Sequence, residues 1–478
     1  MITNKLYING EWMDALSKET FPSINPSTGE IIAVVPKAGG AETKLAIDAA
    51  YNASKEWAKT TVFKRSELLH KIKNLILENS ESLTRLLTME QGKPLYEAEM
   101  EVNGSAKIFE LYAEEAKRIN GETLPNVDSK KRNFVNKVPI GVVAAITPWN
   151  FPLHILCRKI SAALAAGCPV LVKPASDTPL IALALAKLFE EAGFPKGVAN
   201  FIVGDTKQIG NEIFNSPKVA GVSFTGSTAV GKKIIEACAS TVKHVSMELG
   251  GHAPIIVYDD ADIDLAVEGT LINKLRNSGQ TCVCANRIYV HKNVVEEYTT
   301  KLAEKMNKKT QGNGLDNTDL GSLVNEEAIS KIETHVKDAL DKGATLVTGG
   351  SRNKEMQTGY YYLPTILQDI HEEMELMKDE TFGPVAPIIE FDDDEKIIER
   401  VNNTPNGLAA YFYTNNLKKV YEVSEQLEFG VVGVNDTTPV VDHGPFGGVK
   451  QSGIGREGGK EGIEEFLDSK AVSIRLEK

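Results

Sequence analysis

Short apolar runs alternate with helical runs between residues 141 and 259 of the chain. VVAAIT, PVLVKP, ANFIVG, GVSFTG, HVSMEL and PIIVY are typical of β-strands, and segments of helical periodicity separate most of them. Such alternation favours parallel strands, because a helix that crosses one face of the sheet returns the chain to the start of the next strand. The sequence therefore predicts an α/β architecture of the nucleotide-binding type in this region.

A second α/β region is expected between residues 262 and 440. Its candidate strands are RIYV, ATLVTGG, APIIEF, AAYFYT and GVVGVN, with charged helical segments between them. The N-terminal region should begin with a hairpin, because LYINGEWMD alternates around Asn9 and Gly10, and should continue with helices. Residues 121–139 are polar, and the C-terminal SKAVSIRL is typical of an exposed strand. Such an edge either pairs with a partner subunit or belongs to an ordinary surface hairpin.

Composition and charge disfavour several classes of function. The chain has 478 residues, of which 42% are hydrophobic, and a formal net charge of −12. An acidic chain without a basic cluster is a poor binder of nucleic acid. No window approaches the roughly 20 apolar residues of a membrane span, and the N-terminus does not have the pattern of a leader. We therefore expect a cytoplasmic protein that binds small molecules, with no nucleic-acid or membrane partner.

The five cysteines form no disulfide or metal pattern. They stand at positions 157, 168, 238, 282 and 284. An odd and scattered set in a chain of this length predicts reduced thiols. The single-residue gap between Cys282 and Cys284 is shorter than the gaps of zinc knuckles, so we expect no metal.

The segment GVSFTGSTAVG is a candidate phosphate site. Gly226 and Ser227 stand between an apolar run and a helix, and a helix N-terminus offers free N–H groups to a phosphate. The glycine spacing differs from the dinucleotide fingerprint, so the turn taken alone is better explained as an ordinary strand-to-helix connection. Lys173, at the end of PVLVK, is a candidate for reaching a ribose or phosphate. Ser176 is neutral where many such folds carry an acid on the adenosine ribose, which spares a 2′-phosphate from repulsion.

Three other segments carry candidate catalytic residues. Cys282 follows NKLRNSGQT, in which a helix should end at Ser278 and Gly279 and the chain should bend toward a cleft. A thiolate there is a nucleophile, whereas a buried thiol is only a small hydrophobe. Glu248 ends an apolar strand before two glycines, a position with room for a general base or for a salt-bridged carboxylate. Asn150 lies in the proline-flanked PWNFP, a stiff frame from which an amide N–H could stabilise an oxyanion.

Together these segments resemble the NAD(P)-dependent aldehyde dehydrogenase superfamily. PWNFP, KPA, FTGST, ELGG, GQTC, ETFGP and PFGG occur in the order and spacing of that family, and the match covers nearly the whole chain. The resemblance implies that Cys282 attacks the aldehyde, while the Asn150 side chain and the Cys282 backbone N–H hold the oxyanion of a thiohemiacetal. Glu248 would then activate the water that hydrolyses the thioester to a carboxylic acid.

The same resemblance implies NADP or NAD as the cofactor. Glu380 would contact the nicotinamide ribose and Phe382 would lie beside the ring, while Lys173 and Ser176 would contact the adenosine ribose. Most relatives that strictly prefer NAD carry Glu at the position of Ser176, so we expect NADP to be accepted. The cofactor-binding residues implied in this way are Trp149, Lys173, Ser176, Gly226, Ser227, Glu380 and Phe382.

The fold implied by the family is an α/β fold with a Rossmann-type cofactor domain, an α/β catalytic domain and bridging β-segments. Residues 1–120 and 140–250 would form the cofactor-binding domain, and residues 251–440 the catalytic domain. Residues 121–139 and 456–478 would be the bridging and oligomerisation segments, so a homodimer or homotetramer is expected.

The substrate expectation rests on GQTCVCAN, which looks most like the succinate-semialdehyde branch of the family. In that branch Cys284 can pair reversibly with Cys282; the alternative is that Cys284 is a packing residue. Arg158 and Arg276 match the carboxylate-binding arginines of the branch, although both could instead form structural salt bridges.

The segment TTPVVDH, which precedes GPFGG, departs from the pattern of that branch, because it lacks the serine expected there. Val440, Val441 and His443 would therefore shape the pocket mouth differently, and glutarate semialdehyde or an uncharged aliphatic aldehyde stay open as substrates. Rival classes are an acylating dehydrogenase that uses coenzyme A, a cysteine hydrolase, and a non-catalytic binding protein of the same fold. The presence of Cys282, Glu248 and Asn150 together favours the hydrolytic dehydrogenase.

Overall fold

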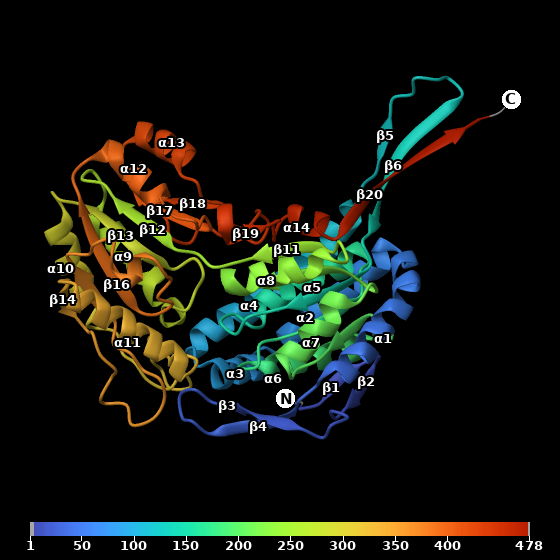
Figure 1. The fold of residues 1–478 in the computed structure, drawn as a ribbon, viewed down its shortest axis with the longest axis horizontal. Helices are drawn as coiled ribbons and strands as arrows, with labels where there is room; N and C mark the ends of the chain where they lie inside the picture. Colours follow the sequence, from blue (N-terminus) through green and yellow to red (C-terminus); the bar gives the residue numbers. More distant parts are fainter. Residues whose placement is uncertain (1–3, 477–478) are drawn as a thin grey trace.

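The part of the chain that the structure describes forms two large sheets with their helices, a two-stranded sheet and a protruding three-stranded arm. The structure, a computed structural model, describes residues 4–476. Figure 1 shows one sheet with its helices on the right, the other on the left, and a three-stranded arm that extends away from the first. The sequence predicted both α/β regions, and each has its own sheet.

The first sheet has the strand order β19-β11-β10-β7-β8-β9-β1-β2. Neighbouring strands from β11 to β9 are parallel, as the alternating pattern predicted. The chain proceeds from β7 to β8 and β9 on one side, and continues with β10 and β11 on the other side of β7. The parallel strands are β7 (Val142–Ile146), β8 (Val170–Lys173), β9 (Ala199–Phe201), β10 (Val219–Thr225) and β11 (His244–Glu248).

The order of these strands has a consequence for function. A crevice opens at the carboxyl ends of β7 and β10, because the connections leave these two adjacent strands in opposite directions. Ligands of open α/β sheets bind at such a switch point. The helices that follow the strands are α5 (His154–Ala166), α6 (Pro179–Ala192), α7 (Thr206–Asn215) and α8 (Thr228–Ala239).

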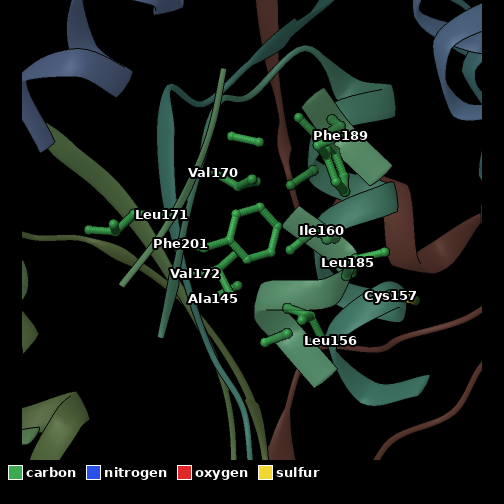
Figure 2. Packing of buried hydrophobic residues seen from close by; sticks show 14 of the residues in the cluster. Ala145, Leu156, Cys157, Ile160, Val170, Leu171, Val172, Leu185, Phe189 and Phe201 are labelled. Atoms are coloured by element: carbon green, nitrogen blue, oxygen red, sulfur yellow. The ribbon is translucent and has the colours of Figure 1, made fainter. Parts of the chain in front are cut away.

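Helices α5 and α6 pack their apolar faces on this sheet. Val170, Val172 and Phe201 face Ile160 and Phe189 in the close-up of Figure 2, and all five side chains are buried. The alanines and leucines of α6 make it apolar on nearly every side, so the helix is buried within the domain rather than amphipathic at its surface.

The N-terminal region supplies edge strands and a layer of helices. The predicted hairpin joins β1 (Leu6–Ile8) to β2 (Glu11–Met13), and both turn residues have positive φ, 54° at Asn9 and 75° at Gly10. A second hairpin, β3 (Thr20–Ile24) with β4 (Ile31–Pro36), was not predicted. The helices are α1 (Gly40–Lys59), α2 (Val62–Glu78), α3 (Ser80–Gln91), α4 (Leu95–Glu115) and the 3₁₀ turn η1 (Ala116–Arg118).

The second sheet has the order β14-β15-β16-β13-β12-β17-β18. The segment PIIVY therefore belongs to this sheet, of which it is the first strand in chain order, and not to the first sheet. Its strands are β12 (Ala253–Val257), β13 (Ala285–His291), β14 (Thr345–Thr348), β15 (Thr365–Gln368), β16 (Val385–Phe391), β17 (Ala409–Tyr413) and β18 (Val431–Val434). Its helices are α9 (Ile263–Leu275), α10 (Val295–Met306), α11 (Glu326–Asp341), α12 (Asp394–Asn402) and α13 (Leu417–Gln426), with the 3₁₀ turn η3 (Glu375–Met377).

Strand β15, four residues inside LPTILQD, was not predicted from the sequence. The last part of the chain also returns to the first sheet, where β19 (Gly453–Ile454) pairs antiparallel with the end of β11. The remaining short elements there are the 3₁₀ turn η4 (Lys450–Ser452) and α14 (Glu461–Glu464).

The arm joins two segments that are far apart in the sequence. β6 (Lys131–Pro139) pairs antiparallel with β20 (Leu467–Arg475) along its whole length, and β5 (Glu122–Leu124) pairs with the other side of β6. Figure 1 shows that this sheet extends away from the body. The exposed C-terminal strand that the sequence predicted is therefore one edge of the arm.

The predicted end of the helix before the cysteine segment is wrong by several residues. Helix α9 ends at Leu275, and Arg276–Gly279 form the separate 3₁₀ turn η2, in which Asn277 and Ser278 have left-handed φ values of 49° and 54°. A carboxylate from α4 causes the difference, because Glu97 accepts the backbone N–H of Asn277 at 2.9 and 3.0 Å.

No helix between residues 4 and 476 is long and apolar enough to cross a membrane.

Candidate active site

A cavity of about 360 Å³ lies at the switch point of the first sheet. Pro148, Trp149 and Asn150 follow β7, and Gly226 and Ser227 follow β10, so the two loops meet there. Helix α11 and loops that connect elements of the second sheet form the opposite wall. Residues on that wall are Cys282, Asn325, Glu327, Ala328, Lys331, Glu380, Thr381 and Phe382.

A second cavity, of about 240 Å³, reaches the same cysteine from the other side. Cys282, Thr225 and Leu249 border both cavities. The thiol is partly exposed, and it lies where the two spaces adjoin. A molecule in either cavity can therefore approach the sulfur of Cys282.

Close backbone contacts hold the segments around the thiol together. A Cβ on Gly251 would collide with the carbonyl oxygen of Cys282, and one on Gly279 would collide with that of Gly383. Only glycine at these positions lets the ELGG, GQTC and TFGP segments approach so closely. Their order in the sequence does not reveal this contact.

The surroundings of Cys282 favour the protonated thiol. Burial raises its pKa to about 12, and the neighbouring carboxyl groups of Glu380 and Glu248 act in the same direction, while Arg158 opposes them. Burial also raises the pKa of both carboxyl groups, that of Glu380 to about 8. A cation bound in the larger cavity would therefore favour the thiolate.

Glu248 is buried at the end of β11 with neither oxygen hydrogen-bonded to a described residue. A Cβ on Gly447 would lie 2.7 Å from its Oε1, so the PFGG segment leaves just enough space for this carboxyl. Burial and the charge of Glu457 raise its pKa well above the usual value, against the opposing charges of Lys159 and Arg158. A buried carboxyl without a partner is costly, and a water molecule would satisfy it.

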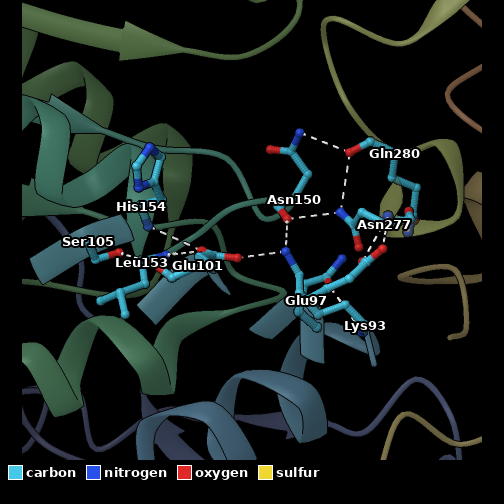
Figure 3. Close-up of polar contacts among 10 residues, drawn as sticks. Lys93, Glu97, Glu101, Ser105, Asn150, Leu153, His154, Asn277 and Gln280 are labelled. Atoms are coloured by element: carbon cyan, nitrogen blue, oxygen red, sulfur yellow. Dashed lines mark hydrogen bonds and ion pairs between the residues drawn. The ribbon is translucent and has the colours of Figure 1, made fainter. Parts of the chain in front are cut away.

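Asn150 is held through both its side chain and its backbone. Its Nδ2 donates to the carbonyl oxygen of Gln280 at 3.1 Å, and its own carbonyl oxygen accepts from Lys93 Nζ at 2.8 Å and from Asn277 Nδ2 at 3.0 Å (Figure 3). The second Nδ2 proton is left for a ligand. Lys93 was not predicted from the sequence, because nothing in EQGKP distinguishes a fully buried lysine from a surface one.

Two carboxylates of α4 complete this network. Glu101 pairs with Lys93 at 2.6 Å, and its other oxygen accepts the backbone N–H groups of Leu153 and His154 at 3.0 and 3.1 Å. Glu97 holds the η2 turn, as described above. One helix thus orients both the loop of Asn150 and the loop of Cys282, and Figure 3 shows these contacts converging.

The predicted cofactor residues fall into two groups. Trp149, Gly226, Ser227, Glu380 and Phe382 border the larger cavity, and the rings of Trp149 and Phe382 meet edge to face with centroids 5.6 Å apart. Lys173 and Ser176 lie outside that cavity. Lys173 Nζ donates to Thr206 Oγ1 at 2.9 Å, and burial lowers its pKa to about 8, whereas Ser176 is exposed.

The larger cavity fits a nicotinamide nucleotide. Glu380 Oε1 is buried without a partner among the described residues, and a Cβ on Gly250 would lie 3.3 Å from Thr228 Oγ1 and 3.4 Å from Glu380 Oε2. Gly250 therefore leaves space between this carboxyl and the start of α8, whose N-cap residue is Ser227. Free N–H groups at a helix N-terminus suit a pyrophosphate, and a carboxylate suits ribose hydroxyls.

The smaller cavity contains both predicted substrate arginines. Arg158 is 5% exposed, and its Nε and Nη2 have no hydrogen-bond partner in the described part of the chain. Its ion-pair partner among the described residues is Asp442 Oδ1, 3.9 Å from Nη2, and its guanidinium carbon lies 5.0 Å from the centre of the Phe446 ring. Arg276 is exposed at the rim, with its guanidinium carbon 5.0 Å from the centre of the Phe151 ring. The two unrelated segments do bring an arginine each to one cavity.

The loop before PFGG lines the smaller cavity with residues that differ in part from those expected. Val440 borders the smaller cavity as predicted, but Val441 and His443 do not, and Asp442 does. The hydrogen bond from Gly444 N to Val441 O closes a turn in this loop. Cys284 is buried beside Lys274, and the structure describes it, like Cys282, as a free thiol.

Comparison with known proteins agrees with this geometry. The sequence profile described as aldehyde dehydrogenase family matches residues 12–472. The chain belongs to the aldehyde dehydrogenase family. The predicted family, enzyme class and α/β fold are therefore confirmed, and a solved structure described as an NADP-dependent enzyme of Escherichia coli superposes with a TM-score of 0.98. That chain is 48% identical, with 99% of this chain and 98% of the other covered.

Three curated relatives match this aldehyde dehydrogenase over nearly the whole length of both chains. The 3-sulfolactaldehyde dehydrogenase of Pseudomonas putida is 48% identical, over 99% of this chain and 97% of its own. The succinate-semialdehyde dehydrogenase (NADP(+)) GabD of Escherichia coli K12 is 48% identical, over 98% of this chain and 97% of its own. The glutarate-semialdehyde dehydrogenase of P. putida KT2440 is 47% identical, over 100% of this chain and 98% of its own.

Proposed function

We propose that the chain oxidises a short aldehyde with an anionic group at its far end, succinate semialdehyde above all, to the corresponding acid with NADP or NAD. The observation that carries this proposal is Arg158, which borders the cavity that ends at Cys282 and whose buried Nε and Nη2 have no hydrogen-bond partner within residues 4–476. A buried guanidinium that has donors without hydrogen bonds, and whose carboxylate neighbour Asp442 is 3.9 Å away, is costly, and the carboxylate of a substrate would satisfy it. The substrates named for the three relatives all end in an anionic group, which supports the same class.

The first chemical step takes place at Cys282. Its thiolate adds to the aldehyde carbon, and the oxygen gains the charge that Asn150 Nδ2 and the Cys282 backbone N–H stabilise. Lys93 and Asn277 keep Asn150 in place through its carbonyl oxygen. A nicotinamide nucleotide held by the residues of the larger cavity would supply the acceptor for the hydride of the same carbon and a positive charge that favours the thiolate.

The second step is hydrolysis of the resulting thioester. Glu248, as carboxylate, takes a proton from water, the water oxygen attacks the acyl carbon, and the thiolate of Cys282 leaves. No residue that the structure describes donates a hydrogen bond to Glu248 and competes for its oxygens. Its position on the side of the smaller cavity supports attack from the face opposite the nucleotide.

The residues that would hold the cofactor follow from the larger cavity. Glu380 would bind the nicotinamide ribose, and Ser227 and Gly226 would bind the pyrophosphate. Trp149 and Phe382 would flank the nicotinamide end. Lys173 and Ser176 would contact the adenosine ribose outside this cavity, and the neutral Ser176 leaves room for the 2′-phosphate of NADP.

The organisation of the molecule extends the proposal. Residues 1–120 and 140–250 form the cofactor-binding domain, residues 251–440 the catalytic domain, and residues 121–139 and 456–478 the bridging segments. The open edges of the arm support assembly into a homodimer or homotetramer. The reduced thiols and the chemistry support a cytoplasmic location.

Steady-state kinetics with both cofactors test the substrate class. We expect kcat/KM for succinate semialdehyde to exceed that for butanal, which has the same number of carbons but no charge, by about a hundredfold or more, because a charge-assisted bidentate contact contributes about 2–3 kcal/mol. Arg158→Ala should remove most of this preference by raising KM.

Glutarate semialdehyde and coenzyme A belong in the same experiment. Equal kcat/KM for butanal and succinate semialdehyde would overturn the proposed class. Transfer of the acyl group to coenzyme A in place of release of free acid would identify an acylating enzyme.

A further inference from the structure

His154 is a second polar residue in the wall of the substrate cavity. It is the first residue of α5, and Arg158 lies one helical turn later on the same face. Both border the cavity of about 240 Å³, together with Arg276. The imidazole is partly exposed there, and no role was expected for it from the sequence.

Contacts with α4 fix the orientation of the ring. A Cβ on Gly104 would lie 3.3 Å from Nδ1 and 3.4 Å from Cε1 of His154, so this edge of the imidazole packs against α4. Nδ1 is buried and has no hydrogen-bond partner in the part of the chain that the structure describes. The backbone N–H of His154 is held by Glu101, which anchors the start of the helix. Nε2 is thus the ring nitrogen left for a ligand.

The charges around the ring keep it neutral. Burial and the nearby cations Arg158, Arg276 and Lys93 hold the pKa of His154 well below its usual value. A neutral imidazole carries a single N–H, and the nitrogen against Gly104 has no acceptor to receive it. The tautomer with the proton on Nε2 therefore suits this site best, because its donor can reach an acceptor in the cavity.

The described part of the loop before PFGG places no neutral side-chain donor on the cavity. Of the segment TTPVVDH, Val440 and Asp442 border the cavity, one apolar and the other an acceptor of hydrogen bonds. Arg158 and Arg276 supply charge, and an anionic group with two or three oxygens has more lone pairs than the Arg158 donors alone can occupy.

We propose that His154 is a specificity-determining residue, whose Nε2–H donates a hydrogen bond to the anionic end of the substrate beside Arg158. It takes the place of the serine that the branch would carry in the loop before PFGG. The inference rests on the proposed function, because it assigns a third contact to the same anionic group.

The test compares two variants on two aldehydes of equal length. His154→Leu removes the donor at similar volume, and His154→Gln keeps an N–H donor at similar reach. We expect the ratio of kcat/KM for succinate semialdehyde over butanal to fall about tenfold or more in His154→Leu, mainly through KM, and to recover at least in part in His154→Gln. His371→Leu, the same exchange at an exposed histidine, is the matched control and should keep the wild-type ratio.

Product binding gives a second measurement that does not need turnover. Titration calorimetry with succinate should yield a weaker Kd for His154→Leu than for the wild type, and an intermediate one for His154→Gln. A wild-type preference for succinate semialdehyde that survives within about twofold in His154→Leu would overturn the role of His154. A wild-type enzyme without that preference would instead overturn the proposed substrate class.

Discussion

Glu248 is a carboxyl group that the fold buries without a hydrogen-bond partner among the described residues. Burial of such a group lowers the stability of a protein, so we infer that the group is placed there for the reaction. Burial favours the protonated form, which cannot act as a base. The same burial makes the carboxylate a stronger base once the proton has left.

This balance predicts how hydrolysis depends on pH. The pKa of Glu248 lies well above its usual value, so the carboxylate fraction is small in acid and grows as the pH rises. We expect the rate of deacylation, measured in a single turnover after the acyl-enzyme has formed, to rise with pH through that shifted pKa. Measuring this step alone separates Glu248 from the titration of the Cys282 thiol.

Glu248→Gln provides the control. It should slow deacylation by about 10²–10⁴-fold, abolish the pH dependence of this step and allow intact-mass spectrometry to detect the acyl group on the protein. Rapid hydrolysis in this variant with an unchanged pH profile would contradict the assignment. Loss of the acyl adduct in Cys282→Ser identifies the sulfur that carries it.

Among the short elements, the η2 turn decides where the nucleophile lies. Asn277, Ser278 and Gly279 all have positive φ, which ends α9 early and directs the chain to Cys282. The conformation is strained for the two residues other than glycine. Hydrogen bonds from Asn277 to Glu97 and to the carbonyl oxygen of Asn150 offset that strain.

Substitution of Gly279 tests the importance of this turn. Its φ is 79°, and a Cβ would collide with the carbonyl oxygen of Gly383, so Gly279→Ala combines backbone strain with a clash. We expect a loss of about 2–5 kcal/mol in the free energy of unfolding and a large loss of kcat. Chemical denaturation and steady-state kinetics measure the two effects.

Gly193→Ala is a matched control for backbone strain alone. Gly193 has a φ of 77° at the end of α6, and a Cβ there would meet nothing within 4 Å. This variant should lose about 1–2 kcal/mol and keep its kcat. If Gly279→Ala behaved the same way, the close approach to Gly383 would not matter for catalysis.

On the scale of the whole molecule, the arm is the feature that a single chain does not explain. β20 and β5 are its two edge strands, and most of their residues are exposed. Val127 at the end of the hairpin is fully exposed, and Leu124 and Ile474 are 37% and 43% exposed. Open strand edges with apolar side chains favour contact with another chain.

Removal of the last strand tests this role. A chain that lacks residues 470–478 loses most of β20 but retains both large sheets. We expect it to fold and to run as a smaller oligomer or monomer in size-exclusion chromatography with light scattering. Leu417→Lys combined with Tyr421→Lys changes exposed apolar residues of α13 and should leave the oligomer intact. An unchanged assembly after the truncation would show that the arm is not the interface.

The sequence by itself determined the two α/β regions, the N-terminal hairpin and the motif segments, because hydrophobic periodicity and turn residues are local properties of the chain. It also determined which residue types stand at Asn150, Glu248 and Cys282. Only the tertiary structure decided the place of β19 and the early end of α9. It also decided the burial of Lys93 and the position of His154 beside Arg158, since each depends on contacts between segments that are far apart in the sequence.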